Sequence, residues 1–187
     1  MKHRIFIAIN LPQDVKKKLR SYKIKWPEIP ARWTFEENLH ITMLFIGEVD
    51  PEYLAEICEI TKEIASKNQL FYLTLKNVSY GPLDKNPKKP PRMLWAIGEK
   101  SEKLNKLKSD IEKIETQQEN NAIREFIPHI TLARIKGFQF AKIDPEELPI
   151  VNEEISIRIP VSSIEVMESV LKRTGPEYAI IDSYELG

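Results

Sequence analysis

The sequence predicts an α+β fold in which two similar lobes, each an antiparallel sheet with outer helices, pack about an approximate two-fold axis around a central cleft. Short apolar runs typical of strands alternate along the chain with amphipathic helix patterns. A strand-helix-strand unit occurs twice at a spacing of 89 residues. Because 187 residues can share one core, we expect a single domain over residues 1–187, with approximate repeat halves 1–80 and 92–187.

The chain begins with a strand and a helix. Arg4–Asn10 is a short apolar run typical of a strand, and from Leu11-Pro12 onward apolar residues recur at helical spacing. A connection rich in proline leads to a second predicted strand, Leu39–Ile46, which Gly47 closes. The first half therefore opens as strand, helix, strand.

A helix and a strand complete this half. Asp50-Pro51 combines an N-cap residue with proline at the first helical position, and an amphipathic pattern continues to about Lys67. Alternation with β-branched and aromatic residues predicts a strand over Leu70–Tyr80. The segment Gly81–Arg92 carries four prolines and is expected to be a loop that divides the halves. Its cations are Lys85, Lys88, Lys89 and Arg92.

The second half repeats the opening pattern. Met93–Gly98 is a predicted strand, Ser101 is a predicted helix cap, and His129–Ile135 is a predicted strand. A shift of 89 residues places Phe6-Ile7-Ala8 on Trp95-Ala96-Ile97. The predicted helix that follows Ser101 has an apolar stripe that is expected to be buried, made of Leu104, Leu107, Ile111 and Ile114. The remaining predicted elements are a short helix at Pro145–Leu148, strands at Ile155–Val161, Ile164–Ser169 and Tyr178–Tyr184, and a turn at Gly175-Pro176.

Composition excludes several classes of function. Acidic and basic residues balance at 28 each, which argues against a general polyanion binder with a strongly basic surface. The single cysteine, Cys58, cannot form an internal disulfide and fits a reducing compartment. The apolar run Ile5–Ile9 is far too short to span a membrane. We therefore expect a soluble cytoplasmic protein that does not bind membranes.

Two of the three histidines open the same pattern, His40-Ile41-Thr42-Met43 and His129-Ile130-Thr131-Leu132. Side chains at i and i+2 of a strand share one face, so each imidazole is expected beside the hydroxyl of its own motif. A two-fold axis between the strands would bring both pairs to one cleft. The duplication is therefore the strongest functional signal in the chain.

Two histidines suit paired proton transfers, since unperturbed imidazoles titrate near pH ~6.5 and one can act as base while the other acts as acid. Attack on a phosphodiester requires this combination, because the nucleophile loses a proton and the leaving oxygen gains one. The threonine hydroxyls can donate to the non-bridging phosphate oxygens. No metal or other cofactor is needed, and neither motif has a third ligand at zinc-site spacing.

The chain resembles the 2H phosphoesterase superfamily, and within it the RNA 2',3'-cyclic phosphodiesterases, also called 2'-5' RNA ligases. The resemblance spans essentially the whole chain. It consists of RIFIAINLP at the start, RWTFEENLHITMLFIGEV and PHITLARI around the two motifs, and MESVLKRTGPEYAII near the end.

This resemblance implies a LigT-like bilobal fold and hydrolysis of a terminal 2',3'-cyclic phosphate of RNA to a 2'-phosphate. It implies that His40 is the proton donor to the departing 3' oxygen and that His129 is the proton acceptor that activates water. Thr42 and Thr131 would hold the phosphate. The reverse reaction would join a 2',3'-cyclic end to a 5'-hydroxyl.

Five further residues are candidates for substrate binding. Arg134 has the odd offset of five from His129, so it needs a bulge or a strand end to reach the same face, and an ordinary ion pair is the alternative. Arg32 and Trp33 are candidates to stack on or clamp a terminal base, with core packing as the alternative for Trp33. Phe45 and Tyr178 are candidates to line the cleft, with core packing again the alternative.

Other readings stay open from the sequence. One is a non-catalytic module that binds RNA ends or nucleotides. Another is a related enzyme acting on ADP-ribose 1'',2''-cyclic phosphate, another small cyclic nucleotide or 2'-5' linked oligonucleotides. The expected partner is an RNA with a 2',3'-cyclic phosphate end, a tRNA-derived end being one candidate, and the expected state is a monomer.

Overall fold

The computed structural model describes residues 2–82, 90–114, 126–173 and 175–187. Residues 83–89 of the predicted basic loop, which include Lys85, lie outside this range. The helices are α1 (Gln13–Ser21), α2 (Pro51–Ser66), α3 (Glu102–Glu112) and α4 (Gly137–Phe140). The strands are β1 (His3–Asn10), β2 (Ala31–Trp33), β3 (His40–Val49), β4 (Phe71–Gly81), β5 (Met93–Gly98), β6 (His129–Ile135), β7 (Asn152–Val161), β8 (Ser163–Lys172) and β9 (Gly175–Glu185).

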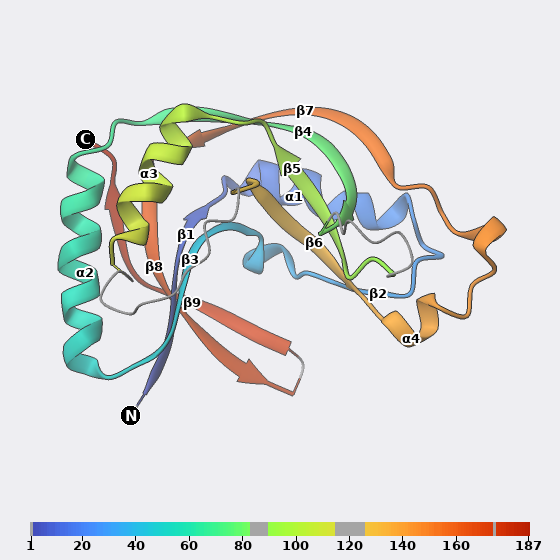
Figure 1. The fold of residues 1–187 in the computed structure, drawn as a ribbon, viewed down its shortest axis with the longest axis horizontal. Coiled ribbons are helices and arrows are strands. Elements are labelled where there is room, and N and C mark those ends of the chain that lie inside the picture. Colours follow the sequence, from blue (N-terminus) through green and yellow to red (C-terminus); the bar gives the residue numbers. More distant parts are fainter. Residues whose placement is uncertain (1, 83–89, 115–125, 174) are drawn as a thin grey trace.

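The strands form one antiparallel sheet in the order β7-β4-β5-β6-β3-β1-β8-β9, with β2 paired to β6 (Figure 1). At its centre β6 meets β3 through the pair Ile41 and Ile130. On one side of this junction lie β3, β1, β8 and β9, which we call the first lobe. On the other side lie β6, β5, β4 and β7, the second lobe. The predicted α+β class with two matching antiparallel halves is confirmed.

The lobes do not follow the halves of the sequence. Strand β4 comes from the first half of the chain and pairs with β5 in the second lobe. The hairpin of β8 and β9 comes from the second half and pairs with β1 in the first lobe. Each lobe therefore mixes both halves, and the repeat halves 1–80 and 92–187 remain a statement about the sequence.

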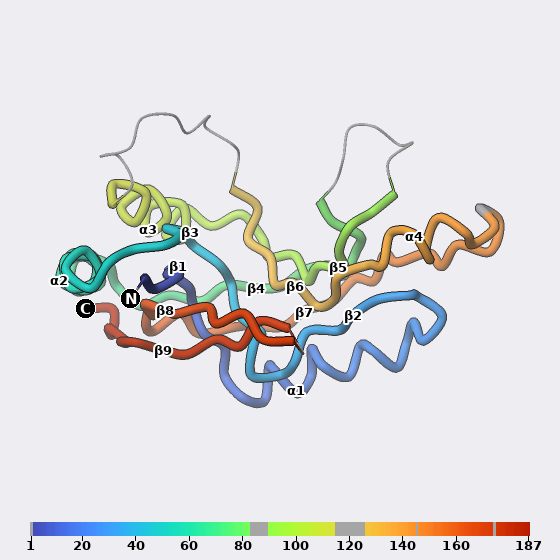
Figure 2. The backbone as a smooth tube through the Cα atoms, turned by 90° about the horizontal axis from the view of Figure 1, so that it is seen from below, coloured from blue at the N-terminus to red at the C-terminus, as the bar shows by residue number. Residues whose placement is uncertain are grey.

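Helices α1 and α3 cross between the lobes in the same way. Helix α3 follows β5 of the second lobe but packs against β3, and α2 packs against β1, β8 and β9. Helix α1 follows β1 of the first lobe but lies along the second lobe, as Figures 1 and 2 show. Both predicted helix caps are present, since the Asp50 carboxylate accepts from the Tyr53 N–H and the Ser101 hydroxyl accepts from the Leu104 N–H.

The main core lies on one face of the sheet. It includes Ile41 and Ile130, which are fully buried, and the predicted α3 stripe. A second, small cluster lies on the opposite face of the first lobe and contains Phe6, Ala8 and Met167, with Tyr178 against it. The alternation within each motif therefore places the isoleucines in the core and leaves the histidines on the other face.

Three predicted boundaries are corrected. Gly47 does not end its strand, because it adopts φ 91° at a β-bulge and β3 continues to Val49. Gly175-Pro176 is not a turn, because both residues pair with β8 in the β8–β9 ladder. The short predicted helix after α4 is a 3-10 turn over Pro145–Glu147.

Candidate active site

The two motifs lie on neighbouring central strands. Because Ile41 pairs with Ile130 in antiparallel register, His40 faces Thr131 across the strands and Thr42 faces His129. His40 and His129 thus occupy diagonal positions on the two strands, whose backbones are roughly 7–8 Å apart at such positions in a regular sheet. The approximate two-fold axis passes between the isoleucines, and it brings both motifs to one face as the sequence predicts.

Each imidazole is oriented by a main-chain carbonyl two residues earlier. The Nδ1–H of His40 donates to the Asn38 carbonyl at 2.7 Å, and the Nδ1–H of His129 donates to the Ile127 carbonyl at 2.8 Å. A carbonyl can only accept, so Nδ1 carries the proton in both neutral rings. The proton-free Nε2 of each ring is therefore the atom available for acid–base chemistry.

The two threonines differ in what they bind. The Thr42 hydroxyl lies 2.9 Å from His40 Nε2 and donates to it. The Thr131 hydroxyl instead points to the sulfur of Met93 at 4.0 Å, which is a weak acceptor. The carbonyl of Thr131 accepts from Thr34 at 2.8 Å. In the free protein, only the first motif has a closed His–Thr hydrogen bond.

Burial sets the protonation of both rings. Burial lowers the pKa of His40 from 6.5 to about 4, helped by the charges of Lys16 and His129 and opposed by the Asn38 carbonyl. Burial likewise lowers the pKa of His129, and the Ile127 carbonyl opposes it. Both histidines are therefore neutral at pH 7 when no ligand is bound.

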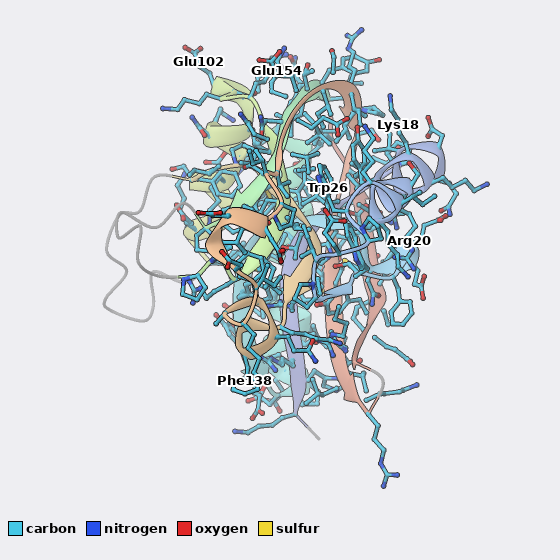
Figure 3. The ribbon with its side chains drawn as sticks, turned by 90° about the vertical axis from the view of Figure 1, so that its right-hand side faces the viewer. Lys18, Arg20, Trp26, Glu102, Phe138 and Glu154 are labelled. Atoms are coloured by element: carbon cyan, nitrogen blue, oxygen red, sulfur yellow. The ribbon has the colours of Figure 1, made fainter. Side chains whose placement is uncertain are left out.

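A buried cation lies behind the first motif. Lys16 on α1 is 6% exposed, donates to the Glu37 carbonyl at 3.2 Å and is attracted by Glu165. Glu165 is 3% exposed and accepts from the Asn10 N–H and the Ser163 hydroxyl. The pattern of α1 favours a solvated basic face, which holds for Lys18 in Figure 3 but is wrong for Lys16, because Lys16 faces the Glu165 side of the sheet.

Aromatic rings surround His40. The Tyr178 ring is nearly perpendicular to the imidazole, with centroids 5.2 Å apart, and the Phe6 ring lies 5.1 Å away. Phe45 contacts Phe6 at 5.6 Å and is 62% exposed. Tyr178 and Phe45 therefore lie on the same face of the sheet as His40, which we call the cleft face.

Arg134 reaches the same face because β6 has a bulge. Trp95 pairs with Thr131 and Leu94 pairs with Ala133, so Leu132 is an extra residue and the alternation shifts by one. Arg134 is exposed, and its guanidinium contacts the Met93 sulfur at 3.9 Å, as the Thr131 hydroxyl also does. Arg32 on β2 pairs directly with Arg134.

Arg32 and Trp33 point to opposite faces of β2. Arg32 is exposed on the cleft face, where its guanidinium lies against Gly175 of β9. Trp33 pairs with buried Ala133 and packs against the main core. Core packing is therefore the correct reading for Trp33, and its predicted contact with a terminal base is not supported, because successive residues of a strand alternate between faces.

Two residues that the sequence analysis did not select support the histidines. Trp95 stacks on His129 with centroids 3.9 Å apart and an interplanar angle of 27°. Asn38 is 7% exposed, and its amide donates to the Pro176 carbonyl at 2.9 Å while its own carbonyl orients His40. The repeat of 89 residues did not point to Trp95. By strand register Trp95 corresponds to Ala8, because Trp95 pairs with Thr131 and Ala8 pairs with Thr42, and Trp95 and Ala8 are 87 positions apart.

Beside Asn38 lies a hollow of about 380 Å³, lined by Phe35, Glu37, Asn38, Gly175, Pro176, Glu177 and Tyr178. Within the described ranges, no group of three or more His, Cys, Asp or Glu side chains is placed to hold a metal ion. None of the described helices is long and apolar enough to cross a membrane.

Comparison with known families gives this arrangement its context. The family model of LigT-like phosphoesterases matches residues 9–95 and 97–178, which include both histidine motifs. The chain belongs to the LigT-like phosphoesterase family.

Individual relatives agree with this assignment. The chain is 30% identical over 183 residues to the RNA 2',3'-cyclic phosphodiesterase of Thermotoga maritima, covering 95% of this chain and 92% of that protein. It is 34% identical over 155 residues to the enzyme of the same name from Aeropyrum pernix, covering 80% and 83%. The crystal structure of TT0787 of Thermus thermophilus superposes with a TM-score of 0.81 at 26% identity, covering 98% and 97%.

Proposed function

We propose that this protein hydrolyses the 2',3'-cyclic phosphate at the end of an RNA to a 2'-phosphate, using His129 as the base and His40 as the acid. The observation that carries the proposal is the pair of imidazoles on one face of adjacent strands, each with a carbonyl that accepts from Nδ1–H, so that Nε2 is the nitrogen without a proton. The relatives named RNA 2',3'-cyclic phosphodiesterase support the choice of substrate.

The reaction exchanges one P–O bond for another. Water attacks phosphorus as its proton passes to Nε2 of His129, and the bond from phosphorus to the 3' oxygen breaks as that oxygen takes a proton from Nε2 of His40. The product keeps the 2' ester. The hydroxyls of Thr42 and Thr131 would turn from their present partners to donate to the non-bridging oxygens, whose charge grows in the transition state.

The acid role requires that His40 gains a proton on binding. Its pKa of about 4 leaves the free imidazole neutral at pH 7, so the negative phosphate must offset the burial that lowers it. When Nε2 becomes a donor, it can no longer accept from Thr42. The Thr42 hydroxyl is then free to turn toward a phosphate oxygen, so substrate binding would assemble both contacts.

Two guanidiniums favour a substrate longer than one nucleotide. Arg32 and Arg134 face each other on the cleft side of β2 and β6, and no described carboxylate forms an ion pair with either. Like charges placed directly opposite in a sheet repel, so an anion between or beside them would stabilise the pair. Phosphates on the 5' side of the cyclic end supply such anions, and arginine binds phosphate through two parallel hydrogen bonds.

The decisive assay uses an oligonucleotide with a 2',3'-cyclic phosphate end and separates the products. We expect a 2'-phosphate, no loss of rate in EDTA, and a fall of about 10² to 10⁴-fold in His40→Ala and in His129→Ala. Full activity in either variant would refute the two-histidine mechanism. A 3'-phosphate product would reverse the assignment of the leaving oxygen.

The contribution of the arginines can be separated from the chemistry. Arg32→Gln and Arg134→Gln should raise KM for the oligonucleotide more than for a mononucleoside 2',3'-cyclic phosphate, with a weaker dependence on salt. Arg158→Gln is the matched control. Arg158 belongs to the edge strand β7, and its guanidinium lies over the ring of Tyr72 on β4. An equal rise in KM for both substrates would show that the arginines do not bind the chain of the RNA.

The reverse reaction in the same cleft would be 2'-5' ligation, in which a 2',3'-cyclic end is joined to a 5'-hydroxyl. A tRNA-derived end is one candidate substrate. Incubating the protein with high concentrations of an oligonucleotide with a 2',3'-cyclic end and one with a 5'-hydroxyl tests whether it ligates them. Metal independence, a monomeric state and a cytoplasmic location stay predictions from the sequence.

A further inference from the structure

We propose that Trp95 is a positioning residue for the general base: its indole face holds the His129 ring in place and stabilises that ring once it is protonated. The inference rests on the proposed function for its catalytic consequence, but not for its physical basis. The two rings stack with centroids 3.9 Å apart and an interplanar angle of 27°. An aromatic face attracts a cation above it, and indole does so most strongly.

The stack depends on Gly81. A Cβ atom at this position would lie 2.2 Å from Cδ2 of Trp95, so the indole occupies the space where any other residue would place a side chain. Strand pairing explains the closeness, since Gly81 pairs with Met93 and Ser79 pairs with Trp95 on the neighbouring strand. The glycine therefore lets the indole lie flat against the sheet beneath the imidazole.

Hydrogen bonding does not explain the indole's position. Trp95 is 7% exposed, and its Nε1–H is buried without a partner among the described residues. A buried donor left unpaired costs stability, so a structural residue at this site would be better replaced by an apolar side chain. The ring is held by Gly81 on one side and His129 on the other, which fits a role toward the imidazole.

The other lobe lacks this arrangement. By strand register, Ala8 occupies the position of Trp95, Phe6 that of Met93 and Met167 that of Gly81. His40 consequently contacts Phe6 at a tilt of 38° and Tyr178 at an interplanar angle of 86°, with no flat stack. An aromatic face attracts a positive charge, and the stacked indole presents its face to His129. The two lobes thus offer different surroundings to a charged imidazole, and the one that accepts a proton in the reaction has the indole face.

The test is the titration of His129 in the free protein by NMR, which is practicable because the chain has three histidines. We expect Trp95→Leu to lower the pKa of His129 by roughly 0.5 to 1.5 units, and Trp95→Phe to stay closer to wild type. Gly81→Ala should act like Trp95→Leu, although it keeps the indole in the chain. Among the described residues, the titratable group that interacts with His129 is His40 on β3, which these variants leave unchanged.

Kinetics provide the second readout. Trp95→Leu should reduce kcat by about 3- to 30-fold, shift the acidic limb of the kcat/KM profile to lower pH and leave KM nearly unchanged, because the buried indole does not reach the substrate. Trp26→Leu is the control: Trp26 is also buried, stacks on Tyr22 and lies in the interior beside α1 (Figure 3).

The outcomes separate cleanly. An unchanged His129 pKa in both Trp95→Leu and Gly81→Ala overturns the proposal, as does an equal shift in Trp26→Leu. Because the titration needs no RNA, it decides the role of Trp95 even if the protein proves inactive on cyclic phosphate ends. If the titration shifts as expected and the wild type does not hydrolyse those ends, the proposed function fails and the indole–imidazole pair stands.

Discussion

Replacing His40 by glutamine should make the protein less sensitive to acid. The imidazole pKa is about 4 in the folded protein and 6.5 at its ordinary value, because burial disfavours the charged ring. Between these values the unfolded chain binds the proton more readily than the folded one. Stability is therefore greatest above pH 6.5 and is lost as the pH falls through this window.

The size of the effect follows from the two pKa values. From 6.5 and about 4, the proton uptake of His40 alone removes about 2 kcal/mol of the free energy of unfolding between pH 7 and pH 5, and about 3 kcal/mol by pH 4. Other groups also titrate in this range. These groups contribute equally to wild type and to His40→Gln, so their contributions cancel in the difference between the two free energies of unfolding. Glutamine is chosen because it keeps a polar side chain near the Asn38 carbonyl and Thr42.

Urea unfolding followed by tryptophan fluorescence at pH 7, 6, 5 and 4 measures this difference. Wild type should lose stability faster than His40→Gln as the pH falls, by about the amounts above. His129→Gln should deviate in the same direction, because burial also lowers the pKa of His129. If the gap between wild type and His40→Gln stays constant from pH 7 to pH 4, His40 is not held neutral by burial and the reasoning is wrong.

Three further variants test individual contacts. Thr42→Val removes the hydroxyl that donates to His40 Nε2 and should reduce kcat by about 10²-fold, whereas Thr42→Ser should keep most activity; equal losses in steady-state assays would assign the effect to packing. Asn68→Ala removes a buried amide that bonds α2 to Asp110 on α3, so it should lower the free energy of unfolding by about 1–3 kcal/mol without changing kcat, as urea melts and rates will show. Asp50→Ala removes the N-cap of α2 and should cost about 1 kcal/mol in a thermal melt, and an unchanged melting temperature would mean that the cap contributes nothing.

Local patterns carried most of the fold. The Asp50 and Ser101 caps, the α3 stripe and the alternation around each motif depend on residues within a few positions, and all of them are confirmed. Strand partners could not be derived in this way. That β4 joins the second lobe and β8 the first is decided by packing between distant segments, so repetition in the sequence did not predict which strands share a lobe.

The sequence predicted those residues of the candidate site that belong to the duplicated motif. It did not predict residues whose place depends on one contact with a distant segment. Both histidines and both threonines come from the duplicated pattern. Lys16 looked like one cation of a basic helix face, and only the position of α1 beneath the sheet shows that it is buried toward Glu165. Trp95 gave no signal of its own, because its stack on His129 depends on the absence of a side chain at Gly81, on another strand.

The two histidine motifs lie on a nearly symmetric backbone but have unlike side chains around them. Both motif strands carry a bulge just after the threonine, at Met43 and at Leu132, so the fifth residue after each histidine returns to the cleft face. That residue is Phe45 in one lobe and Arg134 in the other, which makes one wall aromatic and the other cationic. Since the backbone treats the two rings alike, the proposed distinction between acid and base would come from such exchanges, and we expect substitutions at these paired positions to alter the histidines' roles with little change to the fold.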